Sequence, residues 1–336
     1  MSILTNFING KNNPCPPIWF MRQAGRYLPE FRKIRSKNKN FIKLCLNSSL
    51  SSEITLQPIK RFNLDAAIIF SDILMIPFGL SQEVEFKKNH GPILSNFNLT
   101  NFSKVTTQEF INKLKPVYSA IRKTRIKLDK DKSLIGFAGA PWTLLVYMLG
   151  LKTYENKLDT DIFKKEIKNI NLIQERLIDF IKIHIENQIN AGAEIIQIFD
   201  SWASLIPNEN MDDYCYNPNL ALVEFCKKKN VPVISFPRGI REKYVDFVKT
   251  VKPDVINIDY ALDPMWVKKN LNGICIQGGM DPKTLLKDEK DIIKEARKYL
   301  EIFKGQQYIF NLGHGLLPET NPDKVDMLIK FIRKDK

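Results

Sequence analysis

The run Leu134-Ile135-Gly136-Phe137-Ala138-Gly139 is followed directly by Ala140-Pro141-Trp142-Thr143. A short run of apolar and small residues bounded by glycine is typical of a buried strand. A proline just after it suits the first turn of a helix, because the N–H that proline lacks would have no partner there. The stretch therefore predicts a buried strand leading straight into a helix, the repeating unit of an α/β protein.

The same unit recurs along the whole chain. Apolar runs lie at residues 18–21, 66–70, 134–139, 194–199, 231–236, 255–258, 274–277 and 308–312. Eight strand–helix units in 336 residues favour a (β/α)8 barrel of the TIM type over a doubly wound open sheet, the competing architecture. Residues 73–104 interrupt the pattern as an excursion after the second strand. No repeat or low-complexity linker is found, so residues 1–336 are predicted to form a single domain.

The stretches between these runs have helical patterns. They lie at residues 49–62, 107–127, 161–191, 213–229, 242–251, 283–302 and 322–332. Asp263 precedes Pro264 at the start of a further helix and is expected to cap it.

The net charge of +14 is unevenly distributed. Lysines are scattered through the chain, whereas Arg22, Arg26, Arg32 and Arg35 lie together near its start. Scattered lysine is typical of a solvated surface, and clustered arginine indicates a site. The chain has no nucleic-acid recognition motif and no single basic stripe, so a nucleic-acid partner is not expected.

The five cysteines are odd in number and far apart, without a Cys-x-x-Cys pair or a Cys/His cluster. This spacing indicates a reducing compartment and argues against a disulfide framework or a zinc site. The first thirteen residues have neither an apolar targeting core nor an arginine-rich amphipathic pattern. No run is long enough to span a membrane. A cytoplasmic protein without a membrane partner is therefore expected.

Polar residues gather where the predicted strands end, which is where barrel enzymes place their chemistry. The strand ends and the loops that follow them carry Arg22, Arg26, Asp72, Tyr147, Asp200, Ser201, Arg238, Asp259, Gly278, Gly279 and His314. We take this convergence as an indication that the chain is an enzyme.

Two arginines flanking Ala24-Gly25 suit a polyanionic small molecule, because a guanidinium fork matches a carboxylate and small residues allow close approach. A basic surface turn is the alternative. Asp72, after an apolar strand, can accept N–H bonds or stabilise a cation, although an aspartate there can also simply cap a turn. His314 lies between two glycines that would let the backbone approach a ligand, and an ordinary loop histidine is the alternative.

Tyr147, Ser201 and Arg238 are further strand-end residues that could contact an anionic ligand. Tyr147 can donate to a carboxylate or to Asp72, or pack as an ordinary aromatic side chain. Ser201 can bind an anionic group, and no nucleophile motif surrounds it. Arg238 can extend the anion site or pair with Asp259. Without a metal-ligand set, a dinucleotide fingerprint or a phosphate-binding loop, the inventory suits a reaction on a polycarboxylate that uses no cofactor and no metal.

Two stretches resemble the signatures of the uroporphyrinogen decarboxylase family. They are Pro-x-Trp-x-Met-Arg-Gln-Ala-Gly-Arg-Tyr at 17–27 and Gly-Phe-Ala-Gly-Ala-Pro-Trp-Thr-Leu at 136–144. The resemblance continues at Phe-Ser-Asp-Ile-Leu (70–74), Phe-Asp-Ser-Trp (199–202) and Asn-Leu-Gly-His-Gly (311–315). It runs essentially from end to end of the chain.

The resemblance implies a barrel enzyme, usually a homodimer, that removes the four acetate carboxyls of uroporphyrinogen III as CO2 in heme biosynthesis. The product is coproporphyrinogen III, and no cofactor takes part. Asp72, Arg22 and Tyr147 would be catalytic. The implied substrate contacts are Arg22, Gln23, Ala24, Gly25, Arg26, Asp72, Tyr147, Ser201 and His314. Asp72 would accept pyrrole N–H bonds and stabilise a cationic pyrrole, while Arg22, water or a substrate carboxyl would deliver the protons.

Two alternatives from other classes are compatible with part of the sequence. The cobalamin-linked methyltransferase branch of the same superfamily uses zinc held by His and Cys. Cys275 and His314 lie on adjacent strands here, but a third ligand at suitable spacing is missing. A basic nucleic-acid or tetrapyrrole-binding protein would explain the lysines, but not Arg22, Asp72 and His314 at strand ends.

Overall fold

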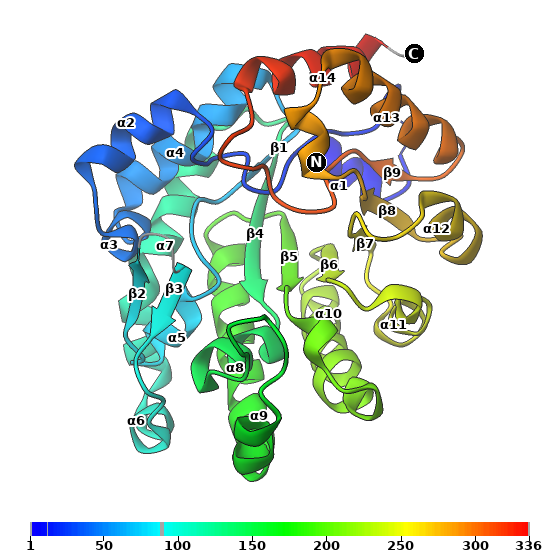
Figure 1. The fold of residues 1–336 in the computed structure, drawn as a ribbon. Coiled ribbons are helices and arrows are strands. Elements are labelled where there is room, and N and C mark those ends of the chain that lie inside the picture. The colour runs from blue at the N-terminus through cyan, green and yellow to red at the C-terminus, as the bar shows by residue number, and fades with distance from the viewer. Residues whose placement is uncertain (1, 12, 88–90, 335–336) are drawn as a thin grey trace.

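Seven parallel strands form one curled sheet at the centre of the computed structural model, which describes residues 2–11, 13–87 and 91–334 (Figure 1). Strands that follow one another along the sheet are β1 (Ala66–Ile68), β4 (Ser133–Gly139), β5 (Ile195–Asp200), β6 (Val233–Pro237), β7 (Val255–Ile258), β8 (Cys275–Gly278) and β9 (Tyr308–Ile309). Nearly all their residues are buried, as expected of a parallel sheet covered by helices. The predicted α/β fold with parallel strands is confirmed.

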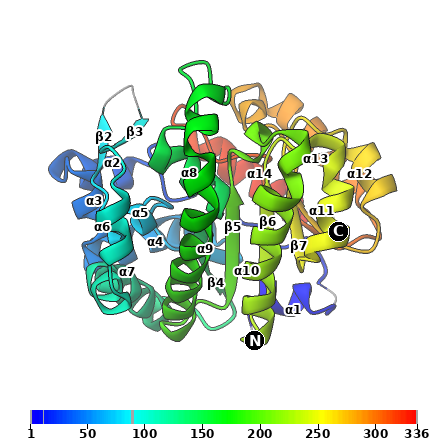
Figure 2. The same cartoon turned by 90° about the horizontal axis from the view of Figure 1, so that it is seen from below.

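Helices cover the outside of the sheet, and most successive helices pack against one another (Figures 1 and 2). The main ones are α4 (Ser48–Phe62), α7 (Thr107–Lys127), α9 (Thr160–Asn190), α10 (Asn217–Lys228), α11 (Tyr244–Val251), α12 (Pro264–Asn270), α13 (Glu289–Ile302) and α14 (Pro322–Lys334). The Thr106 hydroxyl and the Glu109 carboxylate form a capping box that fixes the start of α7. Asp263 caps α12 as predicted, since its carboxylate accepts the Met265 N–H.

Three predicted helices begin later than expected, because a tighter or wider helical turn precedes each of them. A π-helical turn, η3 (Asp212–Tyr216), precedes α10, and 3-10 turns precede the other two, η4 (Arg241–Lys243) before α11 and η5 (Pro282–Leu286) before α13. Two further 3-10 turns, η1 (Ala203–Leu205) and η2 (Asn208–Asn210), follow β5.

The strand expected at residues 18–21 does not form a regular strand. Ile18 makes a single parallel bridge to Phe310, next to β9. On its other side the Ile18 C=O accepts the Asp65 N–H (3.0 Å), and the Ile18 N–H donates to the Asp65 carboxylate (2.7 Å). The preceding prolines have no N–H to donate. The Met21 N–H donates to the Asn311 side chain (3.1 Å). Hydrogen bonds to side chains thus replace some of the backbone-to-backbone hydrogen bonds that define a strand.

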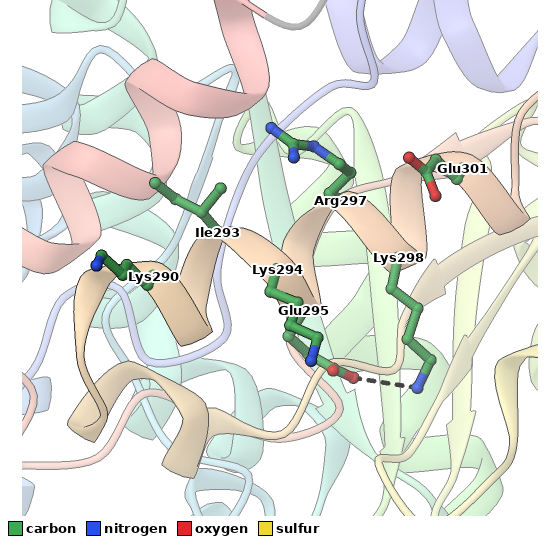
Figure 3. A pocket seen from close by; sticks show the side chains of 7 residues that line it. All are labelled: Lys290, Ile293, Lys294, Glu295, Arg297, Lys298 and Glu301. Carbon is green, nitrogen blue, oxygen red and sulfur yellow. Dashed lines mark hydrogen bonds and ion pairs between the residues drawn. The ribbon is translucent and has the colours of Figure 1, made fainter.

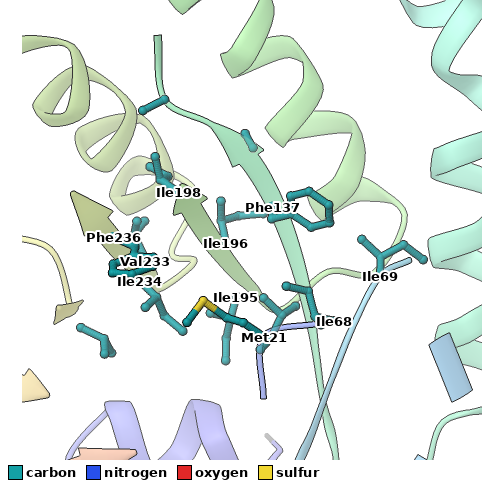
Figure 4. Close-up of a cluster of buried hydrophobic side chains, with 14 of the residues drawn as sticks. Met21, Ile68, Ile69, Phe137, Ile195, Ile196, Ile198, Val233, Ile234 and Phe236 are labelled. Carbon is teal, nitrogen blue, oxygen red and sulfur yellow. The ribbon is translucent and has the colours of Figure 1, made fainter. Parts of the chain in front are cut away.

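Buried apolar side chains on both faces of the curled sheet form one contiguous cluster in the protein interior, part of which is drawn in Figure 4. Met21, Ile68 and Phe137 belong to this cluster. A polar chain crosses the same interior, because the Trp19 indole N–H donates to Gln277 (2.9 Å). The Gln277 amide in turn donates to Asn257 (2.7 Å). These buried amides are paired with one another, as buried polar groups must be.

The excursion is a small subassembly of its own. It contains α5 (Met75–Gly79), the antiparallel hairpin of β2 (Val84–Lys87) and β3 (Gly91–Leu94), and α6 (Leu99–Lys104), while residues 88–90 lie outside the described part.

The sequence prediction did not include α1 (Ile3–Ile8), α2 (Pro29–Lys37) or α3 (Phe41–Cys45). Among the described residues, each helix is too short or too polar to span a bilayer.

Candidate active site

The loop at residues 22–26 is attached to the loop that follows β9. The Met21 N–H donates to the Asn311 side chain (3.1 Å), and the Met21 C=O accepts the Leu316 N–H (2.9 Å). These bonds join the first predicted strand end to the last one. Residues almost 300 positions apart in sequence therefore form one wall of the site.

Arg22 lies directly against the backbone of Gly315. A Cβ at position 315 would be 2.4 Å from Cδ of Arg22, so only glycine lets the guanidinium stem pass there. Arg22 itself has a left-handed φ of 61°, uncommon for a residue with a side chain. Its side chain is exposed, yet the surrounding protein desolvates it and lowers its pKa. Arg22 is thus accessible to solvent and at the same time surrounded closely enough by protein to be partly desolvated.

Gln23 supports this loop from beneath. Its side chain is fully buried, accepts the Phe20 N–H (3.0 Å) and donates to the Ala66 C=O (3.0 Å). Its own C=O accepts the Tyr27 hydroxyl (2.9 Å). The structure thus gives Gln23 a structural role in the loop, and a direct contact with substrate stays a prediction.

Asp72 follows β1 and is half-buried. Its Oδ1 accepts the Leu74 N–H (2.9 Å), which confirms a turn-forming role. Desolvation raises the pKa of the carboxyl to about 6, while the Leu74 N–H and the charge of Arg22 oppose the shift. No donor other than Leu74 is recorded for this carboxylate within the described part of the chain. Asp72 therefore has acceptor capacity left for a ligand.

His314 lies within the electrostatic field of two arginines. Desolvation lowers its pKa to about 4, and the charges of Arg22 and Arg238 act in the same direction. The imidazole is therefore neutral near pH 7 and can donate or accept one hydrogen bond. The flanking glycines serve the protein itself: Gly315 accommodates Arg22, and a Cβ at Gly313 would be 2.4 Å from the Tyr260 nitrogen.

The sequence model of the family described as "Uroporphyrinogen decarboxylase (URO-D)" matches residues 1–334. A protein named uroporphyrinogen decarboxylase from Rickettsia bellii is 42% identical over 340 residues, covering 99% of both chains. One of the same name from Rickettsia felis is 41% identical over 329 residues, covering 96% of this chain and 94% of its own. This chain belongs to the uroporphyrinogen decarboxylase family.

Solved structures of other proteins share the fold. A methyltransferase from Methanosarcina mazei superposes with a TM-score of 0.81 at 15% identity, over 98% of this chain and 97% of its own. A B12-independent methionine synthase from Shewanella gives a TM-score of 0.52 at 11% identity, over 85% of both chains. At such identities the likeness concerns the fold alone.

Tyr147, which the family resemblance singled out, lies on α8 (Pro141–Leu149) beside Trp202. The two rings meet edge to face, with centroids 6.1 Å apart. The Trp202 indole N–H faces the phenol without a hydrogen bond of good geometry, and it partly offsets the desolvation that raises the Tyr147 pKa. The charges of Asp72 and Arg22 also influence the pKa of this phenol, in opposite directions, which places Tyr147 in the site. Sequence reasoning gave Trp202 no role, although it directly follows Asp200-Ser201.

Asp200 has its two oxygens directed into the protein. Oδ1 accepts the Thr143 hydroxyl (2.7 Å), and Oδ2 accepts the Asn219 amide (3.3 Å). The same Thr143 hydroxyl accepts the backbone N–H of Trp202 (3.0 Å). Asp200 is buried and its pKa is raised to about 6 by desolvation. It therefore supports the Ser201-Trp202 turn from outside the site.

The structure thus brings Arg22, Arg26, Asp72, Tyr147 and His314 into one electrostatic neighbourhood. Half-buried Ala24 and Gly25 complete the loop, and half-buried Ser201 follows β5, where its hydroxyl forms no hydrogen bond with any residue that the structure describes.

Nothing in the described part of the chain gathers three His, Cys, Asp or Glu side chains that could hold a metal. Cys275, the thiol considered for such a site, is buried in β8, and desolvation raises its pKa. The thiolate that a metal would need is therefore disfavoured.

A shallow pocket lies on the outer surface of α13 (Figure 3). One helix supplies all its lining residues, and two of them, Lys298 and Glu295, pair with each other at 3.4 Å. None of the candidate site residues lines it.

Proposed function

We propose that the chain converts uroporphyrinogen III into coproporphyrinogen III by removing its four acetate carboxyls as CO2, in heme biosynthesis. The observation that carries the proposal is the half-buried Asp72 carboxylate with free acceptor capacity, electrostatically coupled to Arg22 in a basic neighbourhood. A substrate with many carboxylates and a ring of pyrrole N–H donors needs this combination. Membership of the family gives the reaction its substrate and its carboxy-lyase chemistry.

Each decarboxylation requires the pyrrole to accept an electron pair. A proton adds to a pyrrole carbon and makes the ring cationic, and the electrons of the bond to the acetate carboxyl then move into the ring. CO2 leaves, and an exocyclic methylene forms. A proton adds to that methylene to give a methyl group, and the ring carbon loses its extra proton. One proton is consumed for each CO2 released.

The residues can serve these steps as follows. The ionised Asp72 accepts pyrrole N–H bonds and stabilises the cationic ring. Arg22 binds a carboxylate, and its lowered pKa makes it a better acid than an ordinary guanidinium. Tyr147 and neutral His314 offer hydrogen bonds to further carboxyl groups.

Anaerobic incubation of the purified protein with uroporphyrinogen III, without added metal, tests the reaction. After oxidation, chromatography should show porphyrins with seven, six, five and finally four carboxylates in succession. If the protein is shown to be folded and the substrate keeps all its carboxylates, the proposal is overturned. Metal analysis and a thiol-methylation assay would then test the methyltransferase alternative.

We also propose that the segment 17–21 closes the curled sheet into an eight-stranded barrel. In support, the segment is hydrogen-bonded on both sides. Phe310 donates its N–H to the Pro17 C=O (2.9 Å), and Asp65 donates its N–H to the Ile18 C=O (3.0 Å). An experimental structure without one of these contacts would contradict closure. A single domain over residues 1–336 is supported by an apolar cluster that runs from Leu4 to Ile332.

A homodimer and a cytoplasmic location are proposed from the family resemblance. Tyr260, which follows β7, is 41% exposed, and nearby Met265 is 59% exposed. Such apolar surface beside the strand ends is suited to contact with a second copy. Sedimentation of the purified protein at micromolar concentration should give twice the chain mass, and a monomer would refute the dimer.

A further inference from the structure

Arg238 is a strand-end arginine to which the family resemblance gives no role. It directly follows β6, and its N–H donates to the Asp200 C=O (3.0 Å), which extends the ladder by one residue. Phe236, two residues earlier, pairs in register with Phe199 on β5. Because side chains alternate along a strand, Arg238 and Ser201 continue the face that carries these two rings. That face is the inner one, on which the candidate site lies.

Electrostatic coupling agrees with this placement. The charge of Arg238 acts on Arg22, on Tyr147 and on His314. It therefore lies within reach of the same region as the residues already assigned to the site.

The loop after Arg238 is held firmly. The Gly239 N–H donates to the Asp259 carboxylate (2.8 Å). Gly239 has a φ of +80°, and a Cβ there would be 2.8 Å from Cβ of Ser204. The backbone that carries Arg238 is thus fixed before any ligand arrives, and such pre-organisation favours binding.

Asp259, the carboxylate considered as a partner for Arg238, is already satisfied. Besides the Gly239 N–H, it accepts the Ala261 N–H (2.9 Å) and the Tyr244 hydroxyl (3.3 Å). No ion pair of Arg238 is recorded among the described residues, although the side chain is half-buried. A half-buried guanidinium close to another arginine, without a carboxylate partner, has its hydrogen-bond donors available for an anionic ligand.

We propose that the Arg238 guanidinium binds a peripheral carboxylate of the porphyrinogen and forms, with His314, a carboxylate subsite additional to Arg22 and Arg26. This inference rests on the proposed decarboxylase function. The carboxylate belongs either to an acetate, which the reaction removes, or to a propionate, which every intermediate retains.

The test compares Arg238→Gln with Arg241→Gln. Arg241 is exposed, lies in the same loop and carries the same charge, so it is a matched control. We expect Arg238→Gln to raise KM for uroporphyrinogen III about 10- to 100-fold, the range for losing a hydrogen-bonded charge, and Arg241→Gln to leave it within about twofold. An unchanged KM in Arg238→Gln, or an equal rise in both variants, would overturn the subsite.

Two further measurements separate binding from damage to the fold. Arg238→Lys keeps the charge but loses the fork, so its KM should fall between wild type and Arg238→Gln. The sequence has only three histidines, so proton NMR can follow His314. Its pKa should rise in Arg238→Gln because one repelling charge is gone. A His314 titration identical to wild type would contradict the shared subsite.

The same assays show whether Arg238 binds an acetate or a propionate. They also show whether a negative result concerns the subsite or the decarboxylase function. If Arg238 binds a propionate, the KM ratio of variant to wild type is equal for substrates with eight and with five carboxylates. If it binds an acetate, the ratio falls as acetates are lost. Wild-type protein without activity would refute the decarboxylase proposal, whereas an active wild type with an unaffected variant would refute only the subsite.

Discussion

Asp72 and Asp200 follow two strands of the same sheet, and burial raises the pKa of both to about 6. Their surroundings differ. Asp200 receives the Thr143 hydroxyl and the Asn219 amide, so both of its oxygens are used inside the protein. Asp72 receives one backbone N–H, from Leu74, and its other neighbour is the charge of Arg22.

The difference shows that a raised pKa does not by itself identify a functional carboxylate. Asp200 is satisfied by neutral donors and supports the Ser201-Trp202 turn, whereas Asp72 is left with acceptor capacity in an accessible place. Strained or unsatisfied groups are expected where a ligand completes the arrangement.

Asp72→Asn should give the largest effect. Removing a charge that stabilises a cationic intermediate typically costs about 10²- to 10³-fold in kcat. The variant should be as stable as wild type or more stable at pH 8, since a carboxyl whose pKa is raised by folding destabilises the folded state when ionised. Turnover and thermal unfolding measure the two effects. A variant within threefold of wild-type turnover would remove Asp72 from the mechanism.

Asp200→Asn is the matched control for Asp72→Asn. Its turnover should fall far less than that of Asp72→Asn, and its thermal stability should be affected more, because its oxygens hold the protein together. The opposite ranking would mean that Asp200 is the catalytic carboxylate and Asp72 the structural one.

Gly315→Ala should have the second-largest effect. The new Cβ would lie 2.4 Å from Cδ of Arg22 and would displace the guanidinium. A misplacement of about 1 Å can cost about 10²-fold, so kcat/KM should fall by roughly that factor. Gly305→Ala is a suitable control, because it has no neighbour within 4 Å and a left-handed φ that strains the backbone only locally. Equal activities of the two variants would contradict the contact.

The sequence predicted the regular elements best where their signals are local. The helix at 107–127 and the strand at 255–258 have the predicted bounds, because a cap or a turn adjoins each of them. It failed at 18–21, where the hydrogen-bond partners are the side chains of Asp65 and Asn311, far away along the chain. The buried role of Gln23 and the contact between Arg22 and Gly315 were missed for the same reason. Such contacts arise only when distant strand ends meet.

Thr143→Val should affect stability more than activity. The substitution keeps the shape but removes the donor to Asp200 and the acceptor of the Trp202 N–H. Leaving buried polar groups unpaired costs about 1–3 kcal/mol of unfolding free energy. The loss should be larger at pH 8 than at pH 5, because the Thr143 hydroxyl stabilises the ionised form of Asp200. Urea unfolding at the two pH values measures it, and an equal loss at both would show that the carboxylate is not involved.

The pH dependence of kcat/KM offers the finest distinction between the two aspartates. Asp72 must be ionised to stabilise a cation, so kcat/KM should fall as the pH drops through about 6. The pKa of Asp200 is also raised to about 6, so the wild-type profile alone does not show which aspartate causes this acidic limb, the fall in kcat/KM at low pH. In Thr143→Val the pKa of Asp200 should rise further, because a hydrogen bond that favours its ionised form is lost. A limb that stays near pH 6 in this variant belongs to Asp72, whereas a limb that moves upward belongs to Asp200 and makes the Ser201-Trp202 turn part of the catalytic machinery.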